Sequence, residues 1–229
     1  MKYGVTITLT GVALITICKN ANPLLCALGI WLGGNFILLG VAHFGRNHRI
    51  FGKRADGRLR AWSFVLFFPL VIVNTTIWHH ARFLGSEPSL NKVTDDLFVG
   101  RRLLSAEVPQ EFANYVDLTA EFQEPQKPRL TAGYVAFPIL DGAAPTLDEL
   151  DAVISRLRPG STFIHCAQGH GRTGLVALAI LLSRGAVDRV DDGLALLRKA
   201  RPGIRLNGDQ LRCIEAYADR LRASLPQRR

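Results

Sequence analysis

The sequence predicts an α/β fold, with a mostly parallel central sheet flanked by helices and preceded by two or three transmembrane helices. Long stretches before residue 90 carry no formal charge, as expected of membrane helices. The rest of the chain alternates short β-rich runs with helical patterns, which is typical of a parallel sheet. We therefore expect a membrane region over residues 1–89 and a second domain over residues 90–229, joined by a short linker at 85–88.

The positive charge of the chain is concentrated in the predicted membrane region. The 229 residues carry a formal net charge of +9 and give a sequence pI near 9.9, which by itself suggests nucleic acid or an anionic membrane as partner. However, residues 1–89 contain nine Lys and Arg against two acids, whereas residues 90–229 contain nineteen against seventeen. Nucleic acid is therefore not expected as a partner. The 48% apolar content also excludes a disordered chain.

Three apolar segments are candidates for crossing a membrane: residues 5–18, 24–44 and 61–78. A helix needs about 20 residues to cross the hydrocarbon, so segments 24–44 and 61–78 are long enough. Segment 5–18 is either a third, weaker span or an interfacial helix. A cleaved signal peptide is the alternative interpretation of segment 5–18, although no small-x-small cleavage site follows it.

A basic loop lies between the last two apolar segments and is opposed only by Asp56; its basic residues are Arg46, Arg49, Lys53, Arg54, Arg58 and Arg60. The positive-inside tendency places this loop in the cytoplasm. A full crossing by segment 61–78 would then carry the second domain, with Cys166, to the opposite face. In a bacterial periplasm, a cysteine of low pKa at that position would be exposed to oxidation. A re-entrant or interfacial segment, which Pro69 permits, would keep the domain cytosolic. The sequence leaves both topologies open.

The elements of the second domain follow from its changing hydrophobic period. Thr146 and Glu149 form a capping box that opens a helix ending before Pro159. Gly174–Arg184 is a near-continuous apolar helix, which indicates burial against a sheet. Two amphipathic helices are expected over Val190–Ala200 and Gly208–Ala223. The expected strands are Leu97–Val99, Tyr115–Leu118, Tyr134–Leu140 and Thr162–Cys166.

The clearest chemistry lies where a predicted strand meets the apolar helix. The strand ends at Cys166, a glycine-containing loop follows, and a helix begins near Thr173. The backbone N–H groups of such a loop converge at a helix N-terminus, which makes an anion site. The residues expected to bind the anion are Ala167, Gln168, Gly169, His170, Gly171 and Arg172.

The side chains around this anion site suit the transfer of a phosphoryl group. Cys166 lies at its rim, where the N–H groups and the helix dipole stabilise a thiolate nucleophile. The planar guanidinium of Arg172 can hold two phosphoryl oxygens at once. Thr173 can donate a hydrogen bond to the sulfur when the sulfur leaves. His165 is interpreted as an orienting group rather than a base, because it lies on the strand before the loop.

The segment His165-Cys166-Ala167-Gln168-Gly169-His170-Gly171-Arg172-Thr173 resembles the signature of the cysteine-dependent protein tyrosine and dual-specificity phosphatases, which is His-Cys, five residues, Arg and then Ser or Thr. The resemblance extends over roughly residues 92–220. In type it is most similar to the mitochondrial and bacterial members that act on phosphatidylglycerophosphate. It implies the cysteine phosphatase fold for residues 90–229 and, with the apolar segments, an integral protein of a bacterial inner membrane.

The resemblance implies a two-step reaction through a phosphocysteine, in which an Asp on a preceding loop protonates the leaving oxygen and later activates water. Asp141 is the candidate acid, because it follows the strand Tyr134–Leu140 and precedes the loop 142–145. The alternative is that Asp141 only begins a turn with Gly142. Asp148 is the rival acid, but it lies in a first helical turn, where the helix dipole already favours a carboxylate.

Gln210 resembles a late Gln of the family that positions water, and it fits a helix start with Asn207 equally well. Cys213 is interpreted as a core residue, and Cys18 and Cys26 lie in apolar segments. The four cysteines form no CxxC motif and no paired spacing. Neither a metal, a cofactor nor a disulfide framework is therefore expected.

The expected function is hydrolysis of phosphomonoesters at a membrane. The expected partners are a phosphorylated protein, carrying phosphotyrosine, phosphoserine or phosphothreonine, or a phospholipid head group, with membrane lipid around the apolar segments. The loop lacks the Lys residues of family members specialised for phosphoinositides, which argues against a multiply phosphorylated inositol. Two alternatives are a catalytically idle phosphate-binding module and a membrane transport or scaffold protein. Intact Cys166, Arg172 and Asp141 argue against the first, and the small number of spans argues against the second.

Overall fold

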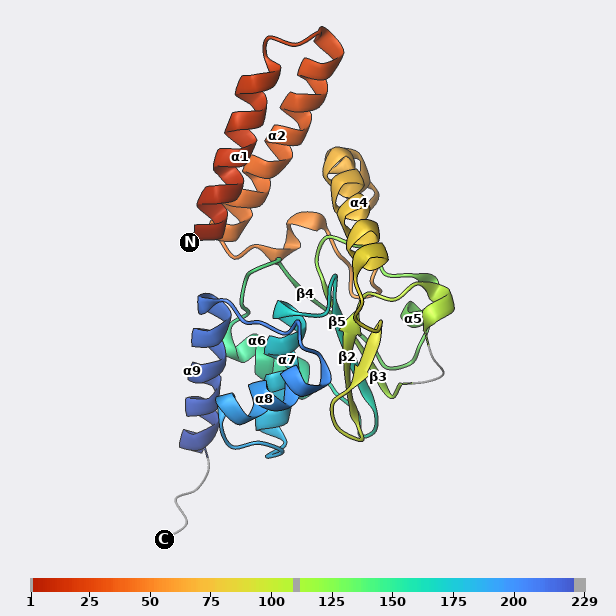
Figure 1. Ribbon diagram of the computed structural model, residues 1–229, viewed down its shortest axis with the longest axis vertical. Helices are drawn as coiled ribbons and strands as arrows, with labels where there is room; N and C mark the ends of the chain where they lie inside the picture. Colours follow the sequence, from red (N-terminus) through yellow and green to blue (C-terminus); the bar gives the residue numbers. More distant parts are fainter. Residues whose placement is uncertain (1, 109–111, 225–229) are drawn as a thin grey trace. The chain divides into compact units, whose positions relative to one another are not determined.

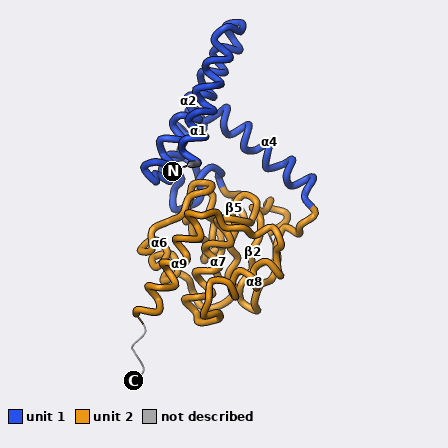
Figure 2. The backbone as a smooth tube through the Cα atoms, turned by 60° about the vertical axis from the view of Figure 1, so that its left-hand side comes forward, with its two compact units in different colours: residues 1–85, 120–123 blue, residues 86–119, 124–229 orange. Residues whose placement is uncertain are grey.

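The computed structural model describes residues 2–108 and 112–224 (Figure 1). Two compact units are distinguished in Figure 2. Unit 1 contains residues 1–85 and the short segment 120–123, and unit 2 contains residues 86–119 and 124–229. The chain therefore passes from unit 2 to unit 1 and back within a single loop.

Unit 1 begins with a helical hairpin of α1 (Lys2–Cys18) and α2 (Pro23–Phe44). Asn22 caps α2, because its side chain accepts a hydrogen bond from the Leu25 backbone N–H at 3.0 Å. Glycines let the two helices approach closely: a Cβ atom on Gly11 would collide with the carbonyl oxygen of Gly33. A short 3-10 helix, η1 (His48–Phe51), lies in the basic loop that follows.

One helix of the described residues is long and apolar enough to cross a membrane, and that helix is α2. It has 22 residues, and 22% of its most apolar stretch is buried. The expectation of two or three spanning helices is thus corrected to one by length and composition. Helix α1 is apolar but has only 17 residues.

The expected span over 61–78 is not one helix. It is broken at Phe67 into α3 (Ala61–Leu66) and α4 (Phe68–Leu84), with Pro69 in the first turn of α4. Proline lacks a backbone N–H and its ring clashes with the preceding turn, so the helix cannot continue through it unchanged. The carbonyl oxygen of Leu66, beside the break, accepts hydrogen bonds from Trp31 Nε1 at 2.8 Å and Asn35 Nδ2 at 2.9 Å.

The segment 120–123 is held within unit 1 by its backbone and side chains. Lys53 Nζ donates to the carbonyl oxygen of Phe122 at 2.6 Å, and the Leu59 N–H donates to Gln123 Oε1 at 3.3 Å. The buried Phe122 ring lies 6.3 Å from the ring of Trp78. Lys53 of the basic loop is therefore a structural residue as well as a surface charge.

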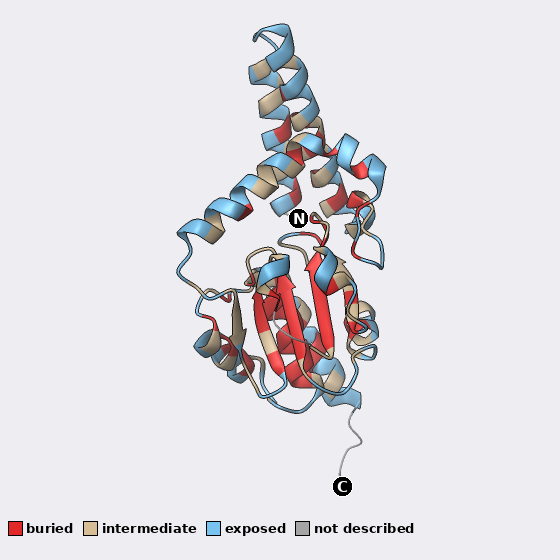
Figure 3. Ribbon diagram, turned by 90° about the vertical axis from the view of Figure 1, so that its right-hand side faces the viewer, coloured by how far each residue is buried: buried red, intermediate tan, exposed pale blue. Residues whose placement is uncertain are grey.

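Unit 2 is built on a five-stranded sheet with the order β1-β2-β5-β3-β4. Only β1 pairs antiparallel; the other pairings are parallel. The predicted α/β class with a mostly parallel sheet is thus confirmed. The strands are β1 (Leu90–Lys92), β2 (Leu97–Arg101), β3 (Asn114–Thr119), β4 (Tyr134–Ile139) and β5 (Thr162–Cys166). All residues of β3 and β5 are buried (Figure 3).

The helices of unit 2 complete its layers. The larger ones lie together in Figure 1 and share one apolar core with the sheet; they are α6 (Leu147–Ile154), α7 (Gly171–Ser183), α8 (Val190–Ala200) and α9 (Gly208–Ser224). Tyr115 and Phe163 belong to a second, smaller cluster. Two short elements complete unit 2: η2 (Ser105–Glu107) and α5 (Gln126–Arg129). The capping box predicted for α6 is confirmed, with Thr146 and Glu149 bonded reciprocally.

Candidate active site

The loop between β5 and α7 is a tight turn around the sulfur of Cys166. The Gly169 N–H donates to Cys166 Sγ at 3.2 Å. Gly169 has a φ of +77°, and a Cβ atom there would collide with the carbonyl oxygen of Gly100 on β2. Glycine is therefore required at this position, both by the backbone conformation and by the close approach. Because α7 begins at Gly171, the loop N–H groups and the helix N-terminus favour an anion beside the sulfur.

Arg172 is buried at the start of α7, with its side chain 2% exposed. Its Nη1 donates to the carbonyl oxygen of Ile139 at 2.9 Å, at the end of β4. Its Nη2 lies 3.1 Å from Oδ1 of Asp141, whose side chain is 84% exposed. One end of the guanidinium is thus held by the end of β4, and the other end meets a solvent-exposed carboxylate.

The structure separates the two candidate acids. Asp141 lies beside Arg172, whereas Asp148 lies on the exposed surface of α6 and accepts a hydrogen bond from Arg220 of α9 at 2.7 Å. Arg220 also bonds Asp151 at 2.8 Å. Asp148 therefore belongs to a surface ion-pair cluster between two helices, and Asp141 is the carboxylate that lies next to the loop.

Thr173 is fully buried, and its Oγ1 has no hydrogen-bond partner within the described parts of the chain. A buried hydroxyl without a partner costs free energy, on the order of 1–3 kcal/mol. Thr173 lies one residue after Arg172, in the first turn of α7.

Gln210 forms the helix start with Asn207 that the sequence offers as one of its two interpretations. Its Oε1 accepts from the Asn207 N–H at 3.1 Å while Asn207 Oδ1 accepts from the Gln210 N–H at 3.0 Å, which is a reciprocal cap at the start of α9. The side chain is also buried against the site: Nε2 donates to the carbonyl oxygen of Ala143 at 3.2 Å, and Gly171 lies next to its amide. Asn207 Nδ2 bonds Gly142 at 2.8 Å. The start of α9 therefore holds the loop that carries Asp141.

Arg201 is a site residue that sequence reasoning missed. Its guanidinium is buried and binds the loop from behind, donating to the carbonyl oxygens of Gly169 and Gln168 at 2.9 Å each. It also donates to Pro88 O and Asn91 Oδ1 at 2.7 Å each. When these loop carbonyls point back to Arg201, the N–H groups of the same peptides point toward the opposite, anion side. The only sequence signal was the break Arg201-Pro202-Gly203 between two helices.

Glu87 ties the segment before β1 to the same loop. Its Oε2 lies 2.6 Å from Nε2 of His170 and 3.2 Å from Nη2 of Arg201, and its Oε1 accepts from the Gly203 N–H at 2.7 Å. Burial alone would raise the pKa of Glu87, but the hydrogen bonds from His170 and Gly203 and the charge of Arg201 outweigh it and lower the pKa. Glu87 therefore stays ionised and holds the His170 side chain at the loop.

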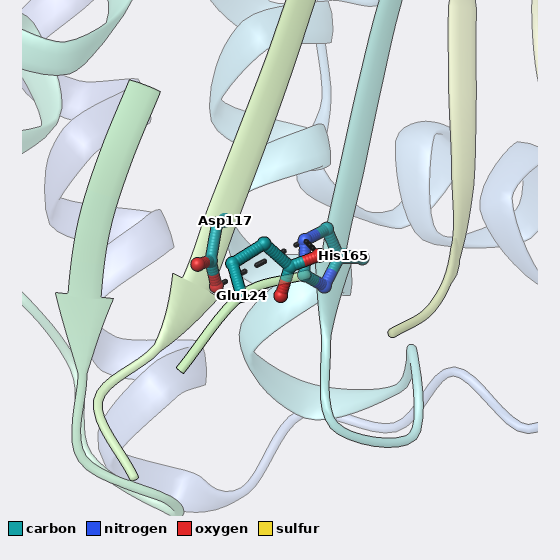
Figure 4. Close-up of side chains that lie close together, drawn as sticks. All are labelled: Asp117, Glu124 and His165. Carbon is teal, nitrogen blue, oxygen red and sulfur yellow. Dashed lines mark ion pairs between the residues drawn. The ribbon is translucent and has the colours of Figure 1, made fainter. Parts of the chain in front are cut away.

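His165 lies fully buried under the loop, on the strand that ends in Cys166. Its Nδ1 is 3.4 Å from the carbonyl oxygen of Cys166. On its other side lie two buried carboxylates, Asp117 and Glu124 (Figure 4). His165 thus lies on the strand directly before the loop, and its role as an orienting group stays a prediction. The two carboxylates beside it were not anticipated.

No family model matches the chain, and no curated protein matches it. Solved structures do match in fold. The crystal structure of Tk-PTP in the active form has a TM-score of 0.52 and 23% identity, covering 58% of this chain and 98% of its own. Human DUSP28 has a TM-score of 0.51 and 17% identity, covering 59% and 97%.

A third similar structure is that of PTPMT1 in complex with PI(5)P. Its TM-score is 0.51 at 16% identity, and the match covers 59% of this chain and 98% of that one. The three structures match over nearly their whole lengths, so the shared part is a complete domain and not a local motif. Unit 2 provides such a domain, with the sheet, the loop and the helices described above. This chain therefore contains the fold of the dual-specificity and tyrosine phosphatases.

Proposed function

We propose that the chain is a phosphoric monoester hydrolase that works through a phosphocysteine. The observation that carries the proposal is the loop itself. The Gly169 N–H donates to the sulfur of Cys166, Arg172 lies in the first turn of α7, and Arg201 bonds two carbonyl oxygens of the loop between them. A dianionic phosphate bound there meets a nucleophile, a planar cation and several N–H donors together.

The proposed reaction has two steps. The Cys166 thiolate attacks phosphorus, the S–P bond forms, the P–O bond to the leaving group breaks, and the leaving oxygen takes the proton of Asp141. Asp141 then removes a proton from water as the water attacks phosphorus, and the S–P bond breaks to release inorganic phosphate and the thiolate. Arg172 binds the phosphoryl oxygens in both steps, and the Thr173 hydroxyl donates a hydrogen bond to the departing sulfur while keeping its proton. Gln210, which bonds the Asp141 loop at Ala143, is proposed to position the water.

The proposed substrates are phosphomonoesters of a protein or a membrane lipid. The fold neighbour PTPMT1 was crystallised with PI(5)P, and the unbroken apolar helix α2 would hold the chain near lipid head groups. Both features favour a lipid phosphate. The variable loop residues Ala167, Gln168 and His170 include no Lys, so a head group with a single accessible phosphate fits better than a multiply phosphorylated one.

Membrane anchoring is part of the same proposal. Helix α2 meets the length and composition of a span, and many large apolar side chains of unit 1 are exposed, among them Leu24, Trp31, Val41 and Phe68. Exposed apolar surface on this scale is typical of a surface covered by lipid. We propose an integral protein of a bacterial inner membrane. Both topologies, with unit 2 on the cytoplasmic or on the opposite face, are compatible with this proposal.

The full-length chain in detergent micelles is expected to release phosphate from phosphatidylglycerophosphate faster than from a phosphotyrosine peptide, in the presence of a metal chelator. The reason is that no metal takes part in the proposed chemistry and α2 shares the micelle with the lipid. Faster release from the peptide would assign a protein substrate. If phosphate binds but no ester is hydrolysed, the chain is an idle phosphate-binding module.

The substitution Asp141→Asn is expected to slow hydrolysis of alkyl phosphates by about 10²–10⁴-fold, because general acid catalysis contributes that much to the departure of a poor leaving group. Hydrolysis of p-nitrophenyl phosphate should slow far less, since its leaving group needs little protonation. The measurement is kcat for both substrates. Asp148→Asn is the matched control, and a larger effect of this control would reassign the general acid to Asp148.

A further inference from the structure

A buried network lies directly behind the nucleophile, on the sheet face that carries His165. Asp117 of β3 is the register partner of His165 of β5, and Glu124 follows β3. His165 Nε2 lies 3.6 Å from Glu124 Oε1 and 3.9 Å from Asp117 Oδ1. All three side chains are fully buried, and Figure 4 shows both carboxyl groups on one side of the imidazole.

Each oxygen of the two carboxyl groups is already an acceptor. Asp117 Oδ1 accepts from the N–H and the hydroxyl of Thr119 at 2.9 and 2.7 Å, and its Oδ2 accepts from the Tyr134 hydroxyl at 2.7 Å. Glu124 Oε1 accepts from the Tyr115 hydroxyl at 3.0 Å, and its Oε2 from Arg102 Nε at 3.3 Å. Donors at all four oxygens favour the ionised form of both carboxyl groups.

The tyrosines cannot supply negative charge or lose their protons here. Burial, and after it the charge of Glu124, raise the pKa of Tyr115 far above its usual value. Burial and the charge of Asp117 do the same to the pKa of Tyr134. Both hydroxyls therefore remain donors, and the charge of the network is set by the carboxylates and the cations around them.

The surroundings of the ring nitrogens favour a proton on each of them. Nδ1 faces the carbonyl oxygen of Cys166, which can only accept a hydrogen bond. Nε2 faces two carboxyl groups at 3.6 and 3.9 Å, and negative charge on these groups favours the protonated ring. The charges nearby favour the same state: Glu124 pairs with the guanidinium of Arg102, Arg129 donates to the backbone carbonyl oxygen of Glu124, and an imidazolium adds a positive charge beside both carboxylates.

We propose that Asp117 and Glu124 are positioning residues that hold His165 as an imidazolium behind the nucleophile. The imidazolium fixes the Cys166 peptide through its Nδ1–H and places a positive charge next to the thiolate. The consequence for catalysis rests on the proposed function, whereas the state of the imidazole does not. The same three side chains offer ligand atoms within 4.8 Å of one another, but a cation would have to displace the donors bound to the carboxylate oxygens.

The pKa of the Cys166 thiol is measured from the pH dependence of its alkylation by iodoacetamide. The full-length chain is alkylated, and the modified Cys166 peptide is quantified by mass spectrometry; the inflection of the rate against pH gives the pKa. Asp117→Asn and Glu124→Gln are each expected to move the inflection up by about one pH unit, because His165 loses the charge that kept it protonated. The sign is diagnostic, since loss of a negative charge without discharge of His165 would move the inflection down. Asp191→Asn, at an exposed carboxylate on α8, is the control with no shift.

The other charged and titratable groups facing this network are the same in the wild type and in both carboxylate variants. They are Tyr115 of β3, Tyr134 of β4, Arg102 after β2, Arg129 of α5, which binds the Glu124 carbonyl oxygen, and Cys166 itself. An inflection that falls or stays unchanged in both variants overturns the proposal.

A second measurement needs no carboxylate variant and therefore no assumption about folding. ¹⁵N spectra of the wild-type chain, with the His165 signals assigned by their loss in His165→Gln, are expected to show both ring nitrogens protonated above about pH 7.5, where an ordinary histidine is neutral. A single neutral tautomer there would contradict the proposal. Neither measurement depends on phosphate release, so failure of the proposed enzymatic function leaves this inference standing, and the reverse also holds.

Discussion

Cys166→Ser is expected to abolish phosphate release while leaving phosphate binding intact. Oxygen replaces sulfur with little change of shape, so the Gly169 N–H keeps an acceptor and the loop keeps its turn. A serine hydroxyl is not ionised at neutral pH, however, and is a much weaker nucleophile than a thiolate. Loss of the nucleophile in a comparable two-step hydrolase costs about 10⁶-fold in kcat, so the activity should fall to the assay background.

The matched control is Cys213→Ser. Cys213 lies on α9, and its Sγ donates to the carbonyl oxygen of Pro145 at 3.3 Å, next to the N-cap of α6 and not on the turn that follows Cys166. This variant should keep its activity within about two-fold, as expected of a partly exposed residue outside the site. Residual turnover of Cys166→Ser near that of the wild type would remove Cys166 from the role of nucleophile. Tight binding of phosphate by Cys166→Ser would show that the loop itself is intact.

The fold of unit 2 and the centre of its site could be predicted because both depend on local sequence. Thr146 and Glu149 bond to each other within one helical turn. The turn from Cys166 to Gly171 is equally local, since its glycine satisfies a positive φ and its N–H groups belong to one helix start. Patterns of this kind depend on residues a few positions apart, which a single sequence displays directly.

The support of the site could not be predicted, because it is assembled from distant parts of the chain. Glu87 reaches Gly203 across 116 positions, and Arg201 reaches Pro88 across 113. Asp117 and Glu124 lie beside His165 only because β3 and β5 are neighbours in the sheet. Hydropathy describes such residues as surface charges, and only burial in pairs makes them possible in the interior.

The membrane region illustrates the opposite error. Hydropathy treats 61–78 as a continuous apolar segment, and a window average does not register the break at Phe67, two residues before Pro69. Beside this break, the carbonyl oxygen of Leu66 accepts hydrogen bonds from two side chains of α2. Composition therefore identified the apolar segment, but the backbone hydrogen bonding near one proline determined how many helices it forms.

Arg172→Lys is expected to lower kcat/KM by about 10²–10³-fold, although the positive charge is retained. Arg172 uses one end of its planar fork on the carbonyl oxygen of Ile139 and meets Asp141 with the other. An ammonium group is a single point of charge and cannot hold two phosphoryl oxygens while it is also held by the sheet. The loss should appear in both kcat and KM, because the fork binds the phosphate in the ground state and in the transition state.

Arg184→Lys is the control on the same helix. Arg184 caps the C-terminal end of α7 and pairs with Asp96 at the surface, so its replacement should change activity by less than about two-fold. The thermal stability of both variants is measured alongside, because a buried lysine at 172 is accommodated less well than the arginine. If Arg172→Lys retains full activity at an unchanged melting temperature, a point charge suffices at this position and bidentate binding of the phosphate is excluded. If only KM rises, Arg172 contributes to substrate binding but not to stabilisation of the transition state.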